Sequence, residues 1–241
     1  MDVIDIEDFN KYWNTLKKYD INKVTNNKEV TNNKEVTNMR NKGIAIFGGS
    51  FNPPLNSHLE LAKQIIKNVD YIEKVIFVPV STKYNRKSNL ISDIHRYNML
   101  KLMCIDEEKL EVSDIELNYG RQLYTIETLG IFKEKYPEYN IYFIMGTDNL
   151  KDLHTWMKPE EILKNYKIIV LERNEDNIEK IIEEDKVLRD NKEALIIAKK
   201  IKPIKLSSTI VREKIKNGEE VDVFLKKEVL EYINKNGLYM L

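Results

Sequence analysis

Short apolar runs that alternate with segments of helical spacing constrain the fold of this chain more than any other feature. The apolar runs are residues 44–47, 75–80, 141–145 and 168–171. Helical segments follow at 58–67, after a predicted N-cap at Ser92, at 125–136 and at 159–166. Parallel strands read as such uninterrupted apolar runs, and their right-handed crossovers place helices on both faces of the sheet. The sequence therefore predicts an α/β fold built on a doubly wound parallel sheet.

Two further segments have weaker patterns. Residues 110–117 alternate apolar and polar side chains, which predicts a weaker strand, whereas residues 176–200 are highly charged and are predicted to be mostly helical. Rossmann-like sheets of this kind bind ligands beyond the carboxyl ends of their strands, where the strand order reverses. The loops after Phe47, Val80 and Met145 are therefore expected to share one crevice.

The N-terminal part differs in composition from the rest of the chain. Residues 24–35 repeat the polar hexapeptide VTNNKE. Such a segment cannot bury enough apolar surface to offset the entropy lost on ordering, so a flexible linker is predicted. Residues 4–19 predict a short amphipathic helix that could dock on the main domain or on a partner. We expect an N-terminal extension over residues 1–42 and one large domain over residues 43–241.

Charge and cysteine content exclude several classes of partner. The 39 Lys and Arg residues balance 39 Asp and Glu residues, so no net field attracts nucleic acid or an anionic membrane. No stretch of 18 apolar residues is present, and the acidic N-terminus lacks a signal-like apolar core. The single cysteine, Cys104, lies in an apolar helical pattern, which predicts a buried free thiol. We expect a cytoplasmic protein that holds any phosphate ligand by local contacts.

The segment GGSFNPPLNSH, residues 48–58, connects the first predicted strand to the first predicted helix of the domain. Unpaired N–H groups at the start of a helix attract phosphate, and glycine lets the backbone approach a polyanion closely. His58 could donate a hydrogen bond to a phosphate oxygen. The same composition is also typical of an ordinary turn, so this segment alone does not decide between the two interpretations.

A second candidate anion site is the segment LSSTIVR, residues 206–212. It follows the extended segment 203–205 and begins a helix, with Arg212 about one turn in. Its hydroxyl groups and open N–H groups could face a triphosphate, and Arg212 supplies a forked cation. A hydroxyl N-cap with a solvated arginine explains the same residues.

Taken together, these segments resemble the GGTFDPxHxGH and ISSTxIR signatures of the nicotinate-mononucleotide adenylyltransferase family. Four further matches occur in the family's order: Arg96 within HRYNML, YTIETL at 124–129, GTDNL at 146–150 with Trp156, and YINKNGLY at 232–239. The resemblance spans about residues 43–239. One such motif is a weak signal, but this many in order are hard to obtain by chance.

The resemblance implies an enzyme of NAD biosynthesis. In this reaction the phosphate of nicotinate mononucleotide, and in some cases of nicotinamide mononucleotide, attacks the α-phosphorus of ATP and releases pyrophosphate. Mg²⁺ is expected to arrive with ATP, because three histidines and one cysteine give no site built by the protein for a transition metal. The resemblance also implies that the chain could form a homo-oligomer, although the sequence does not indicate which surface would form the interface.

Site residues follow from the positions that match the motifs. The resemblance implies His58 and Arg212 as catalytic residues. It implies an ATP site formed by Gly48, Gly49, Ser50, Phe51, His58, Ser207, Ser208, Thr209 and Arg212. It implies a mononucleotide site formed by Tyr124, Thr125, Asp148 and Trp156. Two of these have structural alternatives, since Asp148 could cap a helix that starts at Asn149 and Trp156 could belong to the core.

The sequence also departs from the family pattern. Leu55 stands where the family has its first histidine, and Asn52 where it has an aspartate, while Ser57 replaces a glycine. Leucine cannot donate a hydrogen bond to phosphate, so Asn56 and Lys83 are the candidate replacement donors. Residues 81–87 lack the family's PPHK, although Arg86 and Lys87 keep a positive charge there. The other histidines, His95 and His154, are not expected to be catalytic.

Two alternatives to this function remain open. One is another nucleotidyltransferase on the same scaffold, specific for phosphopantetheine adenylyl transfer or for cytidylyl transfer. The segment GTDNL with Trp156 argues against it, because it resembles a site for a pyridine mononucleotide. The other is a nucleotide-binding protein that has lost catalysis, as the substitution at Leu55 would allow. The presence of His58 and Arg212 argues against that interpretation.

Overall fold

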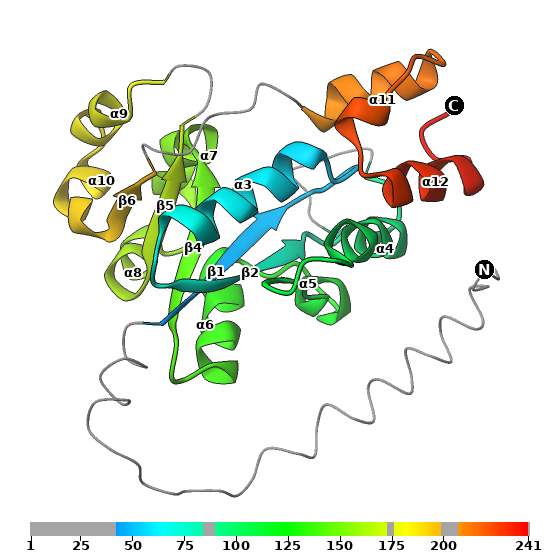
Figure 1. The fold of residues 1–241 in the computed structure, drawn as a ribbon. Helices are drawn as coiled ribbons and strands as arrows, with labels where there is room; N and C mark the ends of the chain where they lie inside the picture. Colours follow the sequence, from blue (N-terminus) through cyan, green and yellow to red (C-terminus); the bar gives the residue numbers. More distant parts are fainter. Residues whose placement is uncertain (1–41, 84–89, 173–175, 199–206, 241) are drawn as a thin grey trace, which may run out of the picture. The chain divides into compact units, whose positions relative to one another are not determined.

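The computed structural model describes residues 42–83, 90–172, 176–198 and 207–240. Within them lies one six-stranded sheet, in the order β3-β2-β1-β4-β5-β6, in which every pair of neighbouring strands is parallel. The strands are β1 (Gly43–Gly49), β2 (Ile72–Pro79), β3 (Leu110–Val112), β4 (Asn140–Gly146), β5 (Lys167–Leu171) and β6 (Leu195–Ile197). The predicted doubly wound fold is confirmed (Figure 1).

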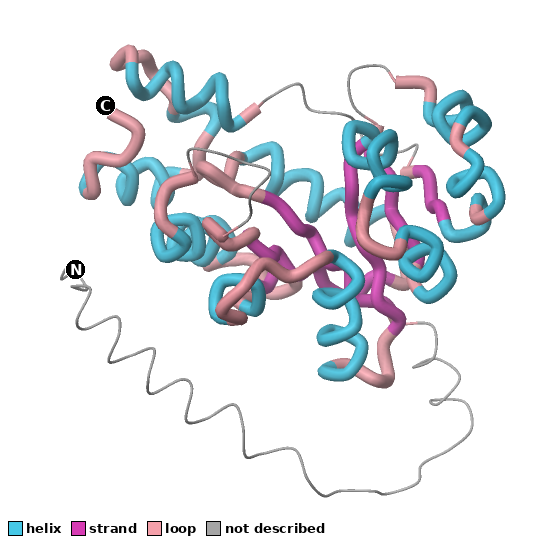
Figure 2. Tube along the Cα trace, turned by 180° about the vertical axis from the view of Figure 1, so that it is seen from behind, coloured by secondary structure: helices cyan, strands magenta, loops and turns pink. Residues whose placement is uncertain are grey.

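Helices cover both faces of this sheet, as the views from the front and from behind show (Figures 1 and 2). The α-helices are α3 (Asn56–Asn68), α4 (Asp93–Cys104), α5 (Ile115–Asn118), α6 (Thr125–Lys135), α7 (Thr147–Asp152), α8 (Pro159–Asn165), α9 (Ile178–Glu184), α10 (Lys186–Asp190), α11 (Ser208–Lys216) and α12 (Lys227–Lys235). Three short 3₁₀ turns are η1 (Leu153–Thr155), η2 (Lys192–Ala194) and η3 (Asp222–Phe224).

Two hydrophobic cores lie on opposite faces of the sheet. Ala45 and Phe47 belong to the core beneath α3, α4 and α12, whereas Ile44 and Ile46 belong to the core beneath α6 and α8. Successive side chains of a strand point to opposite faces, so both faces of a covered strand must be apolar. This explains why β1 reads as a continuous apolar run rather than as an alternating one.

The strand order reverses between β1 and β4. From β1 the chain moves outward through β2 to β3, then returns to β4 on the other side of β1 and continues through β5 to β6. The connections that leave β1 and β4 therefore diverge to opposite sides of the sheet, and a crevice opens at their carboxyl ends. This reversal determines where a ligand can approach the sheet.

Two local predictions need correction, and a third is confirmed in its position only. The predicted strand 110–117 ends at Val112, because the chain turns after the Ser113 N–H bonds to the Phe77 carbonyl, and α5 follows. The predicted helical segment 176–200 holds α9 and α10 but ends in β6, which pairs with β5 and was not predicted. Ser92 occupies the N-cap position of α4, yet its side chain makes no capping hydrogen bond.

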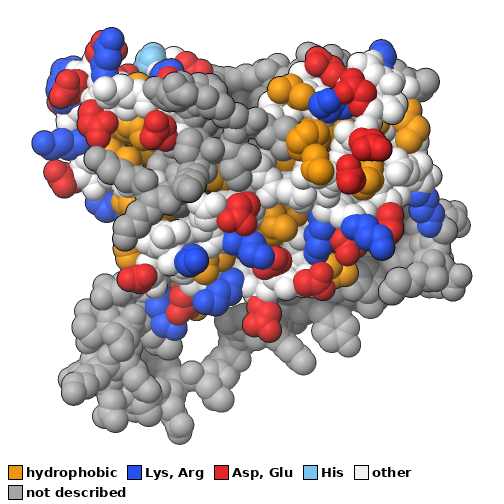
Figure 3. All heavy atoms as spheres, turned by 45° about the horizontal axis from the view of Figure 1, so that its top comes forward, with side chains coloured by type: hydrophobic (Ala, Val, Ile, Leu, Met, Phe, Trp, Pro, Cys, Tyr) orange, Lys and Arg blue, Asp and Glu red, His pale blue; other side chains and the backbone are white. Residues whose placement is uncertain are grey.

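Several predictions fall on residues that the structure does not describe. These are the helix at 4–19, the linker at 24–35, the extended segment 203–205, and Arg86 and Lys87. Cys104 is a buried free thiol, as predicted, and burial raises its pKa to about 12. The face shown in Figure 3 carries interspersed basic and acidic side chains. Among the described residues, no helix combines the length and apolar character needed to cross a membrane.

Candidate active site

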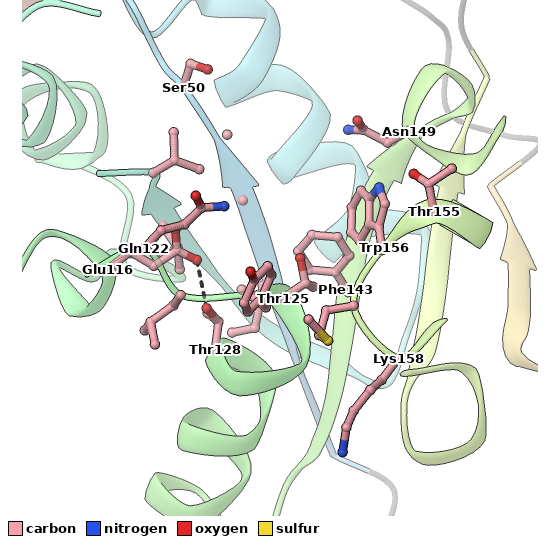
Figure 4. A pocket seen from close by; sticks show the side chains of 18 residues that line it. Ser50, Glu116, Gln122, Thr125, Thr128, Phe143, Asn149, Thr155, Trp156 and Lys158 are labelled. Carbon is pink, nitrogen blue, oxygen red and sulfur yellow. Dashed lines mark hydrogen bonds between the residues drawn. The ribbon is translucent and has the colours of Figure 1, made fainter. Parts of the chain in front are cut away.

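A pocket of about 350 Å³ lies at the carboxyl ends of β1, β2 and β4 (Figure 4). Its lining includes Gly48 and Gly49 at the end of β1 and Ser50 directly after it. It also includes Val80 after β2 and Asn149 on α7, the helix that follows β4. The expectation that the loops after Phe47, Val80 and Met145 share one crevice is therefore confirmed. The reversal of strand order between β1 and β4 produces this pocket.

The pocket brings together residues from both predicted binding sites. Gly48, Gly49 and Ser50 line it from one side, and Tyr124, Thr125 and Trp156 line it from two other segments of the chain. The remaining candidates are not part of this lining. They are Phe51, His58, Asp148, Ser207, Ser208, Thr209 and Arg212, and most of them lie around the first loop, as described below.

Close contacts at the two glycines leave no space for side chains. A Cβ atom on Gly48 would lie 3.2 Å from the Phe143 ring, and a Cβ atom on Gly49 would lie 2.9 Å from the Phe51 ring. Phe51 is buried and has a positive φ of 47°, and the Asn52–Pro53 peptide bond is cis. The Ser50 hydroxyl oxygen is buried and has no hydrogen-bond partner among the described residues. A buried hydroxyl group beside bare backbone is a group that a bound ligand could satisfy.

Arg96 ties the loops after β1 and β2 together. Its side chain is fully buried on α4 and donates to the carbonyl oxygens of Ser50 at 2.8 Å, Val80 at 2.5 Å and Ile91 at 3.2 Å. It also pairs with Asp93. Two of the bonded carbonyls belong to residues that line the pocket. Arg96 therefore fixes the backbone on two sides of the pocket.

His58 lies in the first turn of α3 with one ring nitrogen already engaged. The Leu55 N–H donates to His58 Nδ1 at 3.0 Å, and the ring packs edge-on against Phe51, with centroids 5.2 Å apart. Because Nδ1 accepts a hydrogen bond, the proton of the neutral ring is on Nε2. In this tautomer the N–H donor of the ring is Nε2.

Neither Asn56 nor Lys83 is free in this structure to replace the histidine that is missing at Leu55. Leu55 is buried in the core between α3 and the sheet. Asn56 donates its side-chain N–H to the Val223 carbonyl at 3.2 Å, and Lys83 Nζ donates to the Gly120 carbonyl at 2.7 Å. Both candidate replacement donors are therefore engaged elsewhere in this structure.

Helix α11 is attached to the first loop by side-chain hydrogen bonds. The Ser208 hydroxyl donates to the Pro53 carbonyl at 2.8 Å, and Arg212 Nη1 donates to the Asn52 carbonyl at 2.8 Å. Arg212 Nη2 also donates to Thr209 Oγ1 at 3.2 Å, and the Ser207 hydroxyl caps the helix by accepting from the Ile210 N–H. These two bonds join residues that are 155 and 160 positions apart in sequence, so the two predicted anion sites lie side by side.

Asn52 connects this arrangement to the C-terminal motif. Its side-chain oxygen accepts from the Tyr239 hydroxyl at 2.8 Å, and both residues are at least partly buried. Burial raises the pKa of Tyr239, so the phenol keeps its proton and acts as the donor. The substitution of the family's aspartate by Asn52 leaves a neutral acceptor at this position.

Two segments form the opposite wall of the pocket. Tyr124 and Thr125 lie at the start of α6, and Tyr124 is exposed. Trp156 follows η1 and packs edge-on against Phe143, with ring centroids 6.1 Å apart. It is only partly buried, so one part of the indole contacts the core and another part faces the pocket.

Asp148 lies in the first turn of α7, which begins at Thr147 with Gly146 at the N-cap position. The alternative that Asp148 caps a helix from Asn149 is therefore wrong. Its side chain is exposed, and its neighbour Asn149 lines the pocket.

Glu116 is a pocket residue that the sequence did not reveal. It lies on α5, lines the pocket and accepts a hydrogen bond from the Thr128 hydroxyl at 2.8 Å (Figure 4). Burial raises its pKa to about 7. The sequence placed this residue in the predicted strand 110–117 and did not mark it as a site residue. The only sequence feature that could have indicated a buried carboxylate here is its position between the apolar residues Ile115 and Leu117.

The other two histidines have partners away from the pocket. His95 Nδ1 lies 2.9 Å from the Tyr232 hydroxyl, and His154 Nδ1 lies 3.0 Å from an Asp185 carboxylate oxygen. Neither residue lines the pocket.

Comparison with known proteins first places the chain in a class of nucleotidyltransferases. The family model described as cytidylyltransferase-like matches residues 46–214, which include the first loop and most of α11. A protein of Clostridium tetani named "Probable nicotinate-nucleotide adenylyltransferase" is 34% identical over 196 residues, covering 81% of this chain and 98% of the relative. One of Caldicellulosiruptor saccharolyticus with the same name is 37% identical over 198 residues, covering 81% and 98%. The chain belongs to the nicotinate-nucleotide adenylyltransferase family within this class.

Solved structures show the same fold. The nicotinic acid mononucleotide adenylyltransferase of Plasmodium falciparum, solved in complex with NaAD, aligns with a TM-score of 0.66 at 24% sequence identity. The alignment covers 82% of this chain and 97% of that chain. The predicted family and the predicted nucleotidyltransferase class are both confirmed.

Proposed function

We propose that this chain transfers the adenylyl group of ATP to nicotinate mononucleotide, forming a dinucleotide and releasing pyrophosphate in NAD biosynthesis. The observation that carries this proposal is the pocket in which the Gly48–Ser50 loop faces Trp156 and the start of α6. Such a pocket offers bare backbone to phosphate and an aromatic face to a heterocyclic ring. Membership of the family supports the reaction type.

The acceptor mononucleotide is assigned to the wall opposite the first loop. Its pyridine ring would stack on Trp156, and its carboxylate would face the N–H groups at the start of α6, beside Tyr124 and Thr125. The N-terminus of a helix favours an anion through its open N–H groups and its dipole. Asp148 would bind a ribose hydroxyl. The buried Ser50 hydroxyl has no hydrogen-bond partner among the described residues. This supports the binding of a phosphate oxygen at Ser50, between the two walls of the pocket.

ATP is assigned to the first loop and the adjoining α11. Gly48, Gly49, Ser50 and Phe51 would follow its phosphates, and the hydroxyl groups of Ser207, Ser208 and Thr209 would face the triphosphate. The hydrogen bonds from α11 to the loop at Asn52 and Pro53 support one continuous phosphate site.

His58 and Arg212 would carry the chemistry at this site. A phosphate oxygen of the mononucleotide forms a bond to the α-phosphorus of ATP, and the bond to pyrophosphate breaks. Reactions of this kind depend on alignment and charge neutralisation rather than on a protein nucleophile. His58 Nε2–H and the Arg212 guanidinium would stabilise the negative charge on the phosphates. With Leu55 in place of a second imidazole, these two residues are the main donors.

Magnesium is proposed to enter as Mg·ATP. The described residues contain no group of three or more His, Cys, Asp or Glu side chains that could hold a metal ion. Mg²⁺ commonly keeps water and phosphate oxygens as ligands, so the substrate itself can supply its coordination.

Residues 43–241 are proposed as the nucleotidyltransferase domain, while a cytoplasmic location and self-association stay predictions.

The test is a matrix of donors and acceptors. ATP and CTP are each combined with nicotinate mononucleotide, nicotinamide mononucleotide and phosphopantetheine, with pyrophosphate release followed continuously and products identified by mass. The proposal expects the highest kcat/KM for ATP with nicotinate mononucleotide. A preference for the amide at every pH from 5.5 to 8.5 would overturn the acceptor, and a preference for CTP or phosphopantetheine would overturn the reaction. Binding without pyrophosphate release would show that catalysis has been lost.

A further inference from the structure

Glu116 has an unusual position for an acidic residue in a site that would bind an anionic substrate. Its carboxylate lines the same pocket as Trp156, and Figure 4 shows the two side chains on opposite sides of it. One oxygen accepts the hydrogen bond from Thr128, and this is the only hydrogen bond that Glu116 makes with the described residues. The side chain therefore faces the pocket with acceptor capacity to spare.

Among the described residues, no cation neutralises Glu116. The charged side chains on the surrounding elements have other partners: Asp114 accepts from Asn118, Arg121 pairs with Glu127, Asp93 pairs with Arg96, Lys83 bonds to Gly120, and Lys158 pairs with Glu161. The lining holds two other titratable groups: Lys158, which pairs with Glu161, and Tyr124, which is exposed. Burial raises the pKa of Glu116 to about 7, while the Thr128 hydrogen bond acts in the opposite direction.

A carboxylate in this pocket discriminates between two acceptors that differ only in charge at the pyridine ring. The acid mononucleotide carries a carboxylate there, and the amide mononucleotide carries a neutral group that can donate a hydrogen bond. At an effective dielectric constant of about 20, two like charges roughly 10 Å apart disfavour binding by about tenfold. An ionised Glu116 thus disfavours the acid, whereas a protonated Glu116 does not.

We propose that the protonation state of Glu116 sets the choice of acceptor: the protonated side chain admits the acid mononucleotide, and the ionised side chain favours the amide. This proposal rests on the proposed function, because it needs a pyridine mononucleotide in the pocket. It assigns Glu116 as a specificity-determining residue and makes acceptor choice depend on pH. Binding of the acid mononucleotide then takes up a proton at pH values where Glu116 is ionised.

The sign and size of the effect follow from this linkage. Below pH 7 Glu116 is mostly protonated, and the preference for the acid is fully expressed. Above pH 7 the fraction of protein molecules with a protonated Glu116 decreases. Because the acid mononucleotide binds this form better, the ratio of kcat/KM for the acid over that for the amide falls. Between pH 6 and pH 8 the fall is about fivefold, because the ionised form still binds the acid about a tenth as well. Titration of the 5′-phosphate, with a pKa near 6, affects both acceptors alike and cancels in the ratio.

The experiment measures kcat/KM for both mononucleotides with saturating Mg·ATP from pH 5.5 to 8.5, in the wild type and three variants. In Glu116→Gln, which keeps the size and removes the charge, the ratio should not change with pH. In Thr128→Val, which removes the hydrogen bond that favours the ionised form, the fall should begin at a higher pH. Glu108→Gln, a change at an exposed carboxylate outside the pocket, should behave as the wild type.

A measurement on the wild type alone covers the case in which a variant fails to fold. Calorimetry at pH 7.5 in buffers of different ionisation enthalpy should show uptake of roughly half a proton or more with the acid and much less with the amide. A ratio that stays constant with pH in an active wild type, or a fall that persists in Glu116→Gln, overturns the role of Glu116 alone. Absence of binding and transfer with both mononucleotides overturns the proposed function as well.

Discussion

Replacing Arg96 with methionine would test how the pocket is held together. Methionine keeps much of the length of the buried side chain and removes its charge and all its donors. The carbonyl oxygens of Ser50, Val80 and Ile91 would each lose a hydrogen bond from the guanidinium, and Asp93 would lose its cation. Since Ser50 and Val80 line the pocket, the change affects both stability and the site.

The size of the effect can be worked out from these partners. A buried acceptor left without a donor costs about 1–3 kcal/mol, and an ion pair broken on one side costs about 3–5 kcal/mol. Asp93 keeps hydrogen bonds from the Thr82 N–H at 2.7 Å and from the Ser81 hydroxyl at 3.1 Å, which reduces its share. Ser50 and Val80 line the pocket, where water can replace the lost donor, so we expect the free energy of unfolding to fall by about 4 kcal/mol, less than the full sum of these costs. That is a large part of the 5–15 kcal/mol of a typical domain.

Equilibrium unfolding in urea, followed by circular dichroism and by tryptophan fluorescence, measures this loss. With a slope of about 2 kcal/mol/M, the midpoint should move down by about 2 M. Arg96→Lys keeps the charge but not the fork, so its midpoint should lie between those of the wild type and Arg96→Met. Arg189→Met is the control, since that exposed arginine makes one hydrogen bond to the Glu183 carbonyl. A midpoint for Arg96→Met within about 0.5 M of the wild type would refute the reasoning.

Three further changes address the proposed substrate sites and the loop. Trp156→Ala should raise KM for the mononucleotide about tenfold or more, with KM for ATP nearly unchanged, because it removes the stacking surface; steady-state kinetics in which both KM values rise together would contradict this. Arg212→Lys should lower kcat more than tenfold and lower the urea midpoint slightly, since lysine cannot bond the phosphates and the Asn52 carbonyl together; an unchanged kcat would exclude the assigned role. Gly49→Ala should cost about 1–3 kcal/mol of stability, because its Cβ would meet the buried Phe51 ring, and an unchanged midpoint would show that the ring can move.

The sequence predicted the parts of the fold that depend on local pattern. The runs that became β1, β2, β4 and β5 are apolar because both faces of each strand are covered. The strand β6 has only three residues, all partly buried, so it carries no periodic signal within a charged segment. The strand β3 and the helix α5 share one alternating segment, and the turn between them depends on the bond from Ser113 to Phe77, a residue of another strand.

The candidate site was predictable as a set of loops but not as a set of contacts. The shared crevice follows from strand order, whereas the partners of Arg96 come from two loops and lie up to 46 residues away in sequence. The orientation of His58 depends on the position of the Leu55 N–H. Glu116 was missed because its place in the pocket depends on the turn after β3. Properties of this kind arise from tertiary packing and have no local signature.

The proposed mechanism of adenylyl transfer depends most on His58, the imidazole that remains in the first loop. Its Nε2–H is proposed to act on the phosphates as charge moves in the transition state, so its removal should affect kcat far more than ground-state binding. The most direct measurement compares kcat for adenylyl transfer with the Kd for ATP in the wild type and in His58→Ala, with His154→Ala as an exposed control. We predict a loss of about a hundredfold or more in kcat with a change in Kd below about threefold. Equal losses in kcat and in ATP affinity, or an unchanged kcat, would contradict the account.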